Sequence, residues 1–129
     1  MPNETEQLQE SDLRNFTGTE HYYRDPLTRL IYTDGVKYVA EKAGAYWLIT
    51  AIGSHQIDPK LRRGRLRDLQ FWKLEVKDDK SAVLTCRADS DVPPAITQEI
   101  PYSDFPLKSI EIWVGRDEQG MICYLPSEH

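Results

Sequence analysis

The sequence predicts an α+β domain in which an antiparallel meander of about five strands carries one long helix on one face. Two observations lead to this fold class. Residues 34–53 place apolar side chains at helical spacing, whereas the chain from residue 71 onward alternates apolar and polar side chains as strands do. A long helix followed by hairpins is typical of a helix packed on a sheet. The 129 residues suffice for a single domain, residues 1–129, with its own hydrophobic core.

The N-terminal third begins with a polar tip. Residues 1–10 are acidic and polar, and we expect them to be disordered or frayed. Leu8 and Leu13 are the apolar anchors of a weak helical pattern, which predicts a short N-terminal helix. Residues 19–23 alternate as in a short strand that ends before Pro26.

The long helix of about 34–53 has a clear start, because Thr33 or Asp34 can accept hydrogen bonds from the first free N–H groups. From Ala45 onward its side opposite Val36 also becomes apolar. One face is expected to cover the sheet. The second would be covered by the N-terminal helix, by residues 57–69 or by a partner subunit.

Residues 57–68 form a basic connection to the strands. Alternation predicts a hairpin of residues 71–76 and 82–86, followed by strands near 96–100, 110–114 and 121–125. In the fourth strand Trp113 falls on the polar side, which predicts an aromatic ring on the outer face of the sheet.

Composition narrows the class of protein. The net charge of −5 argues against a general nucleic-acid binder, although five of the 16 basic residues lie within residues 60–67. No apolar run is long enough to span a membrane, and the polar N-terminus is not a signal peptide, so we expect a cytoplasmic protein. Cys86 and Cys123 are interpreted as buried thiols, with a disulfide or a metal pair as alternatives.

Support for catalysis is thin. His21 and His55, the two internal histidines, have no metal-ligand spacing, and Ser54, His55 and Asp58 are too close in sequence for a catalytic triad. We therefore predict no catalytic residues, no metal site and no cofactor. The question whether the protein is an enzyme stays open, and the sequence favours the answer that it is not.

Several segments carry a family resemblance: "FTGTEHYY", "YTDGVKYVAEKAGAYWLI", the "LTC" strand, "YSDFPL" and "LPSE". Over residues 16–128 the chain resembles a group of small uncharacterised bacterial proteins, frequent in cyanobacteria and often carried near mobile elements. The resemblance implies one intact domain, an intracellular bacterial setting and an accessory or anti-defence role. It brings no functional residues with it.

The candidate binding residues are a basic cluster and one tryptophan. Arginine suits phosphate and carboxylate groups, and Phe71 and Trp72 follow close by for base stacking. The cluster consists of Lys60, Arg62, Arg63, Arg65 and Arg67, and Trp113 completes the set. Three interpretations of the cluster remain open: a solvated loop or internal counter-charge, a nucleic-acid contact, and a contact to an acidic protein.

From these observations we expect a small soluble bacterial accessory protein that acts as a non-enzymatic binding module. Its partner would be a protein or a protein–nucleic-acid complex, and the protein itself a monomer or a homodimer. One alternative is direct nucleic-acid binding through residues 60–67. The other is a small-molecule-binding or enzymatic domain with a pocket between helix and sheet near His21, Tyr38 or Tyr46.

Overall fold

The structure is a computed structural model that describes residues 8–129. The strands are β1 (Tyr22–Arg24), β2 (Ile31–Thr33), β3 (Leu69–Val76), β4 (Ala82–Arg87), β5 (Ile96–Ile100), β6 (Ser109–Asp117) and β7 (Gly120–Tyr124). The α-helices are α1 (Glu10–Leu13), α2 (Asp34–Ala43) and α3 (Tyr46–His55), and short 3₁₀ turns form η2 (Pro59–Arg62), η3 (Gly64–Arg67) and η4 (Pro126–Glu128).

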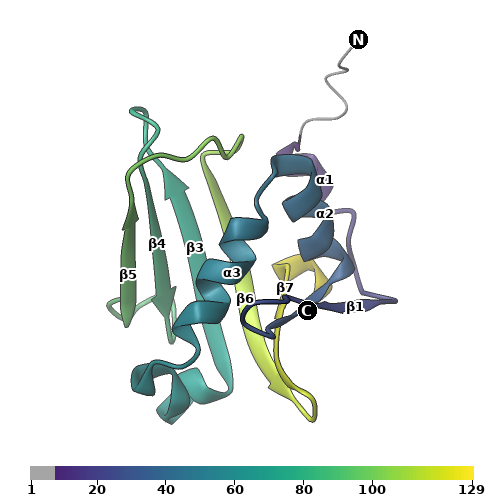
Figure 1. Cartoon of the computed structure of the whole chain (residues 1–129), viewed down its shortest axis with the longest axis vertical. Coiled ribbons are helices and arrows are strands. Elements are labelled where there is room, and N and C mark those ends of the chain that lie inside the picture. The colour runs from purple at the N-terminus through teal and green to yellow at the C-terminus, as the bar shows by residue number, and fades with distance from the viewer. Residues whose placement is uncertain (1–7) are drawn as a thin grey trace.

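All seven strands belong to one sheet in the order β1-β2-β7-β6-β3-β4-β5. Neighbours run antiparallel except for β2 and β7, which are parallel. Helices α2 and α3 lie on the same side of the sheet, with α3 in front of the central strands and α2 near β1 and β7 (Figure 1). We call the side that faces away from these two helices the open face.

The five strands that alternation predicts are present as β3 to β7, but the predicted antiparallel five-stranded meander is wrong. Strand β3 lies between β4 and β6, and two further strands extend the sheet beside β7. The three residues of β2 are all buried, so this strand has no alternation to reveal it. Its parallel partner β7 lies about 90 residues away, and nothing local in the sequence encodes such a pairing.

The predicted single helix of about 34–53 is also wrong, because the chain breaks at Gly44. Gly44 adopts φ 61° and ψ 38°, the left-handed conformation that suits glycine, and its N–H bonds to the Ala40 carbonyl. The Ala45 N–H also donates to the Ala40 carbonyl at 2.8 Å, which completes a helix-terminating motif. Ala45 is buried against the core, and α3 starts in a new direction at Tyr46.

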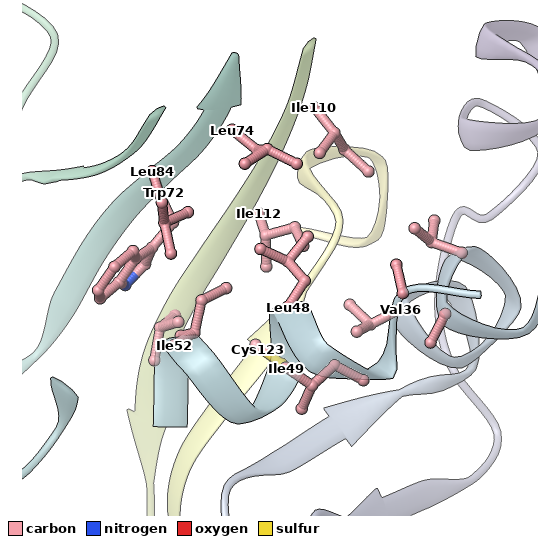
Figure 2. Close-up of a cluster of buried hydrophobic side chains, with 14 of the residues drawn as sticks. Val36, Leu48, Ile49, Ile52, Trp72, Leu74, Leu84, Ile110, Ile112 and Cys123 are labelled. Carbon is pink, nitrogen blue, oxygen red and sulfur yellow. The ribbon is translucent and has the colours of Figure 1, made fainter. Parts of the chain in front are cut away.

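The break explains the two apolar faces that the sequence shows. Helix α2 buries Val36, Val39 and Ala40, and α3 buries Leu48, Ile49 and Ile52. Each helix therefore turns one face to the sheet, whereas a continuous helix would have needed a second cover. Figure 2 shows Val36 of α2 and Leu48, Ile49 and Ile52 of α3 in one cluster with side chains of the strands: Trp72, Leu74, Leu84, Ile110, Ile112 and Cys123. The short N-terminal helix is found as α1, and the part of the predicted disordered tip in residues 1–7 lies outside the described residues.

Two carboxylates fasten the start of α2. The predicted Thr33 cap is confirmed, since its hydroxyl accepts from the Val36 N–H. Asp34 accepts from the N–H groups of Glu20 and His21 and from the Tyr23 hydroxyl, at 2.9, 3.2 and 3.0 Å. Glu128 accepts from the Thr33 hydroxyl at 2.7 Å, the Gly35 N–H at 3.1 Å and the Leu125 N–H at 2.9 Å. Segments from both ends of the described chain thus converge on one helical turn.

Candidate functional site

Strand register places aromatic side chains side by side on the open face. Trp113 of β6 lies opposite Phe71 of β3 on one side and opposite Tyr124 of β7 on the other. Because paired residues of antiparallel strands point to the same face, these three rings form one line across the strands. Their sequence neighbours Trp72, Ile112 and Cys123 point to the helices and are buried. We call Phe71, Trp113 and Tyr124 the aromatic row.

The rings of the aromatic row contact one another at steep angles. The centroids of Phe71 and Trp113 are 5.0 Å apart at 89°, and those of Trp113 and Tyr124 are 6.3 Å apart at 76°. His129 adds a fourth ring 5.2 Å from Trp113. The three rings of the row are half-buried, and partial burial raises the pKa of Tyr124. Edge-to-face packing holds the row in place while part of its surface stays open to solvent.

A groove of about 510 Å³ lies over one end of the aromatic row. Phe71 and Trp113 line it together with the charged side chains of Lys73, Arg87, Glu75 and Glu111. Asp89 and Ser90, just after β4, form part of its rim. The groove is therefore a partly aromatic hollow with charges of both signs.

Arg87 is held in a fixed position by neutral groups. Its Nε donates to the Val92 carbonyl and one terminal nitrogen donates to the Thr85 hydroxyl, both at 3.2 Å. Within residues 8–129 neither Arg87 nor Lys73 forms an ion pair with a carboxylate. Arg87 lies opposite Phe71 across β3 and β4, so an uncompensated positive charge continues the line of the aromatic row.

The basic cluster lies on the two 3₁₀ turns η2 and η3 and on Arg63 between them. Asp58 caps the first turn by accepting from the Lys60 N–H at 2.9 Å, and Leu61 is buried in the core. All five basic residues of the cluster are exposed: Lys60, Arg62, Arg63, Arg65 and Arg67. In the described part of the chain only Arg65 among them forms an ion pair, with Asp89 at 3.1 Å. The interpretation of the cluster as internal counter-charge thus applies to Arg65 alone.

A buried amide pair fixes the cluster to the domain. Gln70 is fully buried, and its side chain exchanges two hydrogen bonds of 2.9 Å with that of Gln56. Gln70 also donates to the Leu66 carbonyl of η3 at 3.0 Å and accepts from the Trp72 indole at 2.8 Å. Because each polar atom of this pair has a partner, η3 is held on the core rather than hanging free.

The structure brings part of the predicted site together. Arg65 pairs with Asp89, which lines the same groove as Trp113. The Ser90 backbone N–H and the Arg65 guanidinium bond to the Asp89 carboxylate and lower its pKa. The Arg67 carbonyl accepts from Arg116 Nε, three residues beyond Trp113 on β6, at 3.1 Å. In the described part of the chain, residues 8–129, the groove lining does not include Lys60, Arg62 or Arg63.

Sequence reasoning missed two members of the open face, Arg87 and Tyr124. Both occupy the outward positions of alternating strands, which is the one signal that the sequence contains. Their placement beside Phe71 and Trp113 depends on register, and register follows from pairings between distant strands.

His55 and the two cysteines contribute to the packing of the domain and not to the groove. His55 bonds to Gln98 at 2.7 Å and stacks on Trp72, and Cys86 and Cys123 are confirmed as free, buried thiols. Burial raises the pKa of the Cys86 thiol to about 12. Within residues 8–129 no group of three or more histidine, cysteine or carboxylate side chains is arranged to hold a metal ion. No helix there is both long and apolar enough to cross a membrane.

A model of a protein family of unknown function matches residues 7–129. No curated protein and no solved structure matches the chain.

Proposed function

The chain belongs to DUF6876, a family of unknown function, and from the geometry of the open face we propose that it is a non-enzymatic binding module. We propose a small bacterial accessory protein of the cytoplasm whose partner is a protein or a protein–nucleic-acid complex. The anti-defence role that the family resemblance implies is part of this proposal. The contact surface would be the aromatic row with the basic cluster beside it.

The observation that carries the proposal is the position of Trp113. The solvent-facing side of an antiparallel sheet normally carries polar side chains. Here Trp113 lies at the centre of that side with Phe71 and Tyr124 as neighbours and a groove beside it. Tryptophan and tyrosine are among the residues that contribute most to binding energy at protein interfaces. An interaction surface explains why these rings are outside the core.

The interior of the domain offers less support for a small-molecule site. Apolar side chains of α2, α3 and the central strands fill the space between helices and sheet (Figure 2). The groove that is lined by titratable side chains opens on the other side of the sheet. This arrangement favours a surface contact over an internal pocket.

Affinity capture with a matched pair of variants tests the proposal. The tagged protein, Trp113→Ser and Tyr102→Ser would each be incubated with lysate of the host, with and without nuclease treatment. Tyr102 is 68% exposed and lies away from the aromatic row, so it controls for loss of a surface ring. We expect a stoichiometric protein partner that Tyr102→Ser retains and Trp113→Ser loses. Equal capture by Trp113→Ser, with its fold verified by circular dichroism, would contradict the proposal.

A further inference from the structure

We propose that the open face binds single-stranded nucleic acid, with bases on the aromatic row and phosphates on the side of the basic cluster. This inference rests on the proposed binding function and names the chemistry of the partner. It combines three features: partly exposed ring surface, fixed positive charge and the direction in which charge changes along the groove.

The aromatic row supplies a stacking surface. Phe71, Trp113 and Tyr124 follow one another across three adjacent strands. Neighbouring rings meet edge to face, at 89° and 76°, so they offer separate ring faces and edges rather than one continuous plane, and bases of a strand crossing the sheet would contact the rings one at a time. Every base has an aromatic face, and stacking on protein rings is tolerant of sequence. In a duplex those faces are covered by neighbouring base pairs, which restricts this mode of contact to single strands.

Charge changes sign along the groove. Near the start of β3, Arg67 of the basic cluster precedes the strand and Arg87 lies opposite Phe71, while the charge of Arg65 is offset by Asp89. Toward the other end, Glu111 lies opposite Lys73 and Glu75 follows two residues later on β3. A polyanion on the aromatic row therefore avoids repulsion only if its phosphates lie on the side of the basic cluster. The geometry thus fixes an orientation as well as a site.

The Arg87 guanidinium is positioned to bind an anion. Its guanidinium is positioned by the Val92 carbonyl and the Thr85 hydroxyl, which are neutral, so its charge is left for a ligand. Arginine with free N–H groups is well suited to phosphate oxygens. The carboxylates of an acidic protein could also pair with these arginines, but they would not stack on the three rings of the aromatic row. The combination of both features favours nucleotides.

The first experiment measures binding of fluorescein-labelled oligonucleotides of about 12 nucleotides by fluorescence anisotropy. Single-stranded DNA and RNA of mixed sequence are compared with the corresponding duplexes. We expect single strands to bind and duplexes to bind at least about 10-fold more weakly. With about three phosphates contacted, the affinity should fall about 20-fold between about 50 and 200 mM salt. Preference between DNA and RNA would identify which of the two the face takes.

Variants then separate stacking from charge. Trp113→Leu keeps an apolar side chain but removes the ring and should weaken binding about 10-fold or more, while Trp113→Phe should restore most of the affinity. The double variant Arg67→Gln/Arg87→Gln removes two arginines that form no ion pair within residues 8–129, and it should make the logarithmic salt dependence shallower by about 1.4. As a matched control, Lys77→Gln/Lys108→Gln removes two exposed charges at the other end of β3 and should change the affinity by less than about twofold.

Three results would overturn the inference: no oligonucleotide binding at about 50 mM salt, equal binding of duplex and single strand, or unchanged binding by Trp113→Leu. If one of these occurs while nuclease-treated lysate still yields a partner that depends on Trp113, the binding module stands and only its nucleic-acid partner is wrong. If capture is also independent of Trp113, the open face is not the contact surface and both proposals fail.

Discussion

At the scale of single residues, Asp34 and Glu128 determine how α2 begins. Together they accept six hydrogen bonds: from the loop before β1 and from Tyr23 of β1, from Thr33 and the first turn of α2, and from Leu125 just before η4. The free N–H groups and the positive end of the helix dipole both favour a negative charge at that place. Each carboxylate therefore joins segments that the backbone alone would not hold together.

Replacing Glu128 by alanine is expected to lower the free energy of unfolding by about 2 kcal/mol, because hydrogen bonds to a charged acceptor are lost and the Thr33 hydroxyl is buried. Urea denaturation of both proteins measures the difference. The control is Glu118→Ala, at an exposed position of the β6–β7 turn, which should change the stability by less than about 0.5 kcal/mol. Equal losses in the two variants would contradict this role of Glu128.

Asp34 predicts a pH dependence. The N–H of Glu20, the Tyr23 hydroxyl and the N–H of His21 bond to the ionised carboxylate and lower its pKa. A carboxyl whose pKa is lower in the folded state stabilises the fold above its unfolded pKa of about 3.9, and this contribution is lost as pH falls through the folded value. Asp34→Asn should thus be less stable than the parent protein at pH 7, and the difference should shrink below about pH 4.

Urea denaturation at a series of pH values checks this dependence, with Asp91→Asn at an exposed loop position as the control. A stability difference for Asp34→Asn that stays constant from neutral pH into the acid range would show that its carboxylate has no special role.

At the scale of elements, the break at Gly44 lets two short helices each present an apolar face to the sheet. A Cβ at Gly44 would meet no atom within 4 Å, so only the backbone conformation opposes a side chain there. In a continuous helix, by contrast, alanine at position 44 would be more stable than glycine, because alanine is the best helix former.

Gly44→Ala therefore distinguishes the two arrangements by the sign of its effect. With φ at +61°, alanine should lower the free energy of unfolding by about 1 kcal/mol, whereas in a continuous helix it would raise stability by a similar amount. Gly44→Asn should cost less than Gly44→Ala, since asparagine tolerates the left-handed conformation. Thermal and urea unfolding of the two variants measure both differences, and stabilisation by alanine would argue for an unbroken helix.

At the scale of the whole molecule, the two thiols report on global opening. Cys86 on β4 and Cys123 on β7 lie in the core on different strands of the sheet, and burial raises the pKa of each thiol. The thiolate is the reactive form, so both should be inert in the folded state. We expect labelling by a disulfide reagent only as urea unfolds the protein, with the same midpoint as tryptophan fluorescence. Rapid reaction of either thiol without urea would contradict the burial.

The sequence predicts the elements of this molecule better than their arrangement. Alternation is local, and it revealed the strands that contain Trp72, Leu84 and Ile112 because each has a buried and an outer face. It could not reveal β2, which is buried throughout, or the parallel pairing of β2 with β7. The break at Gly44 was hidden because alanine-rich flanks keep the helical pattern intact on both sides.

For the candidate site, too, the sequence predicts single residues but not their arrangement. Trp113 was identified as an outward ring from its own strand, and Arg65 from the basic composition of residues 60–67. The contact of Arg65 with Asp89, and the alignment of Arg87 and Tyr124 with Trp113, depend on how four strands are ordered in the sheet. That order results from packing of the whole domain, and no segment specifies it alone.

The position of β7 has a consequence for how the protein is made. On the ribosome, β1, β2 and α2 are synthesised first, yet β2 can pair on its inner side only when β7 emerges, and α2 receives Glu128 later still. Until then the edges of β2 and β6 both lack their neighbour, and the apolar face of α2 is only partly covered. During synthesis the sheet therefore stays incomplete until β7 has emerged, and pairing between strands so distant in sequence is expected to be slow.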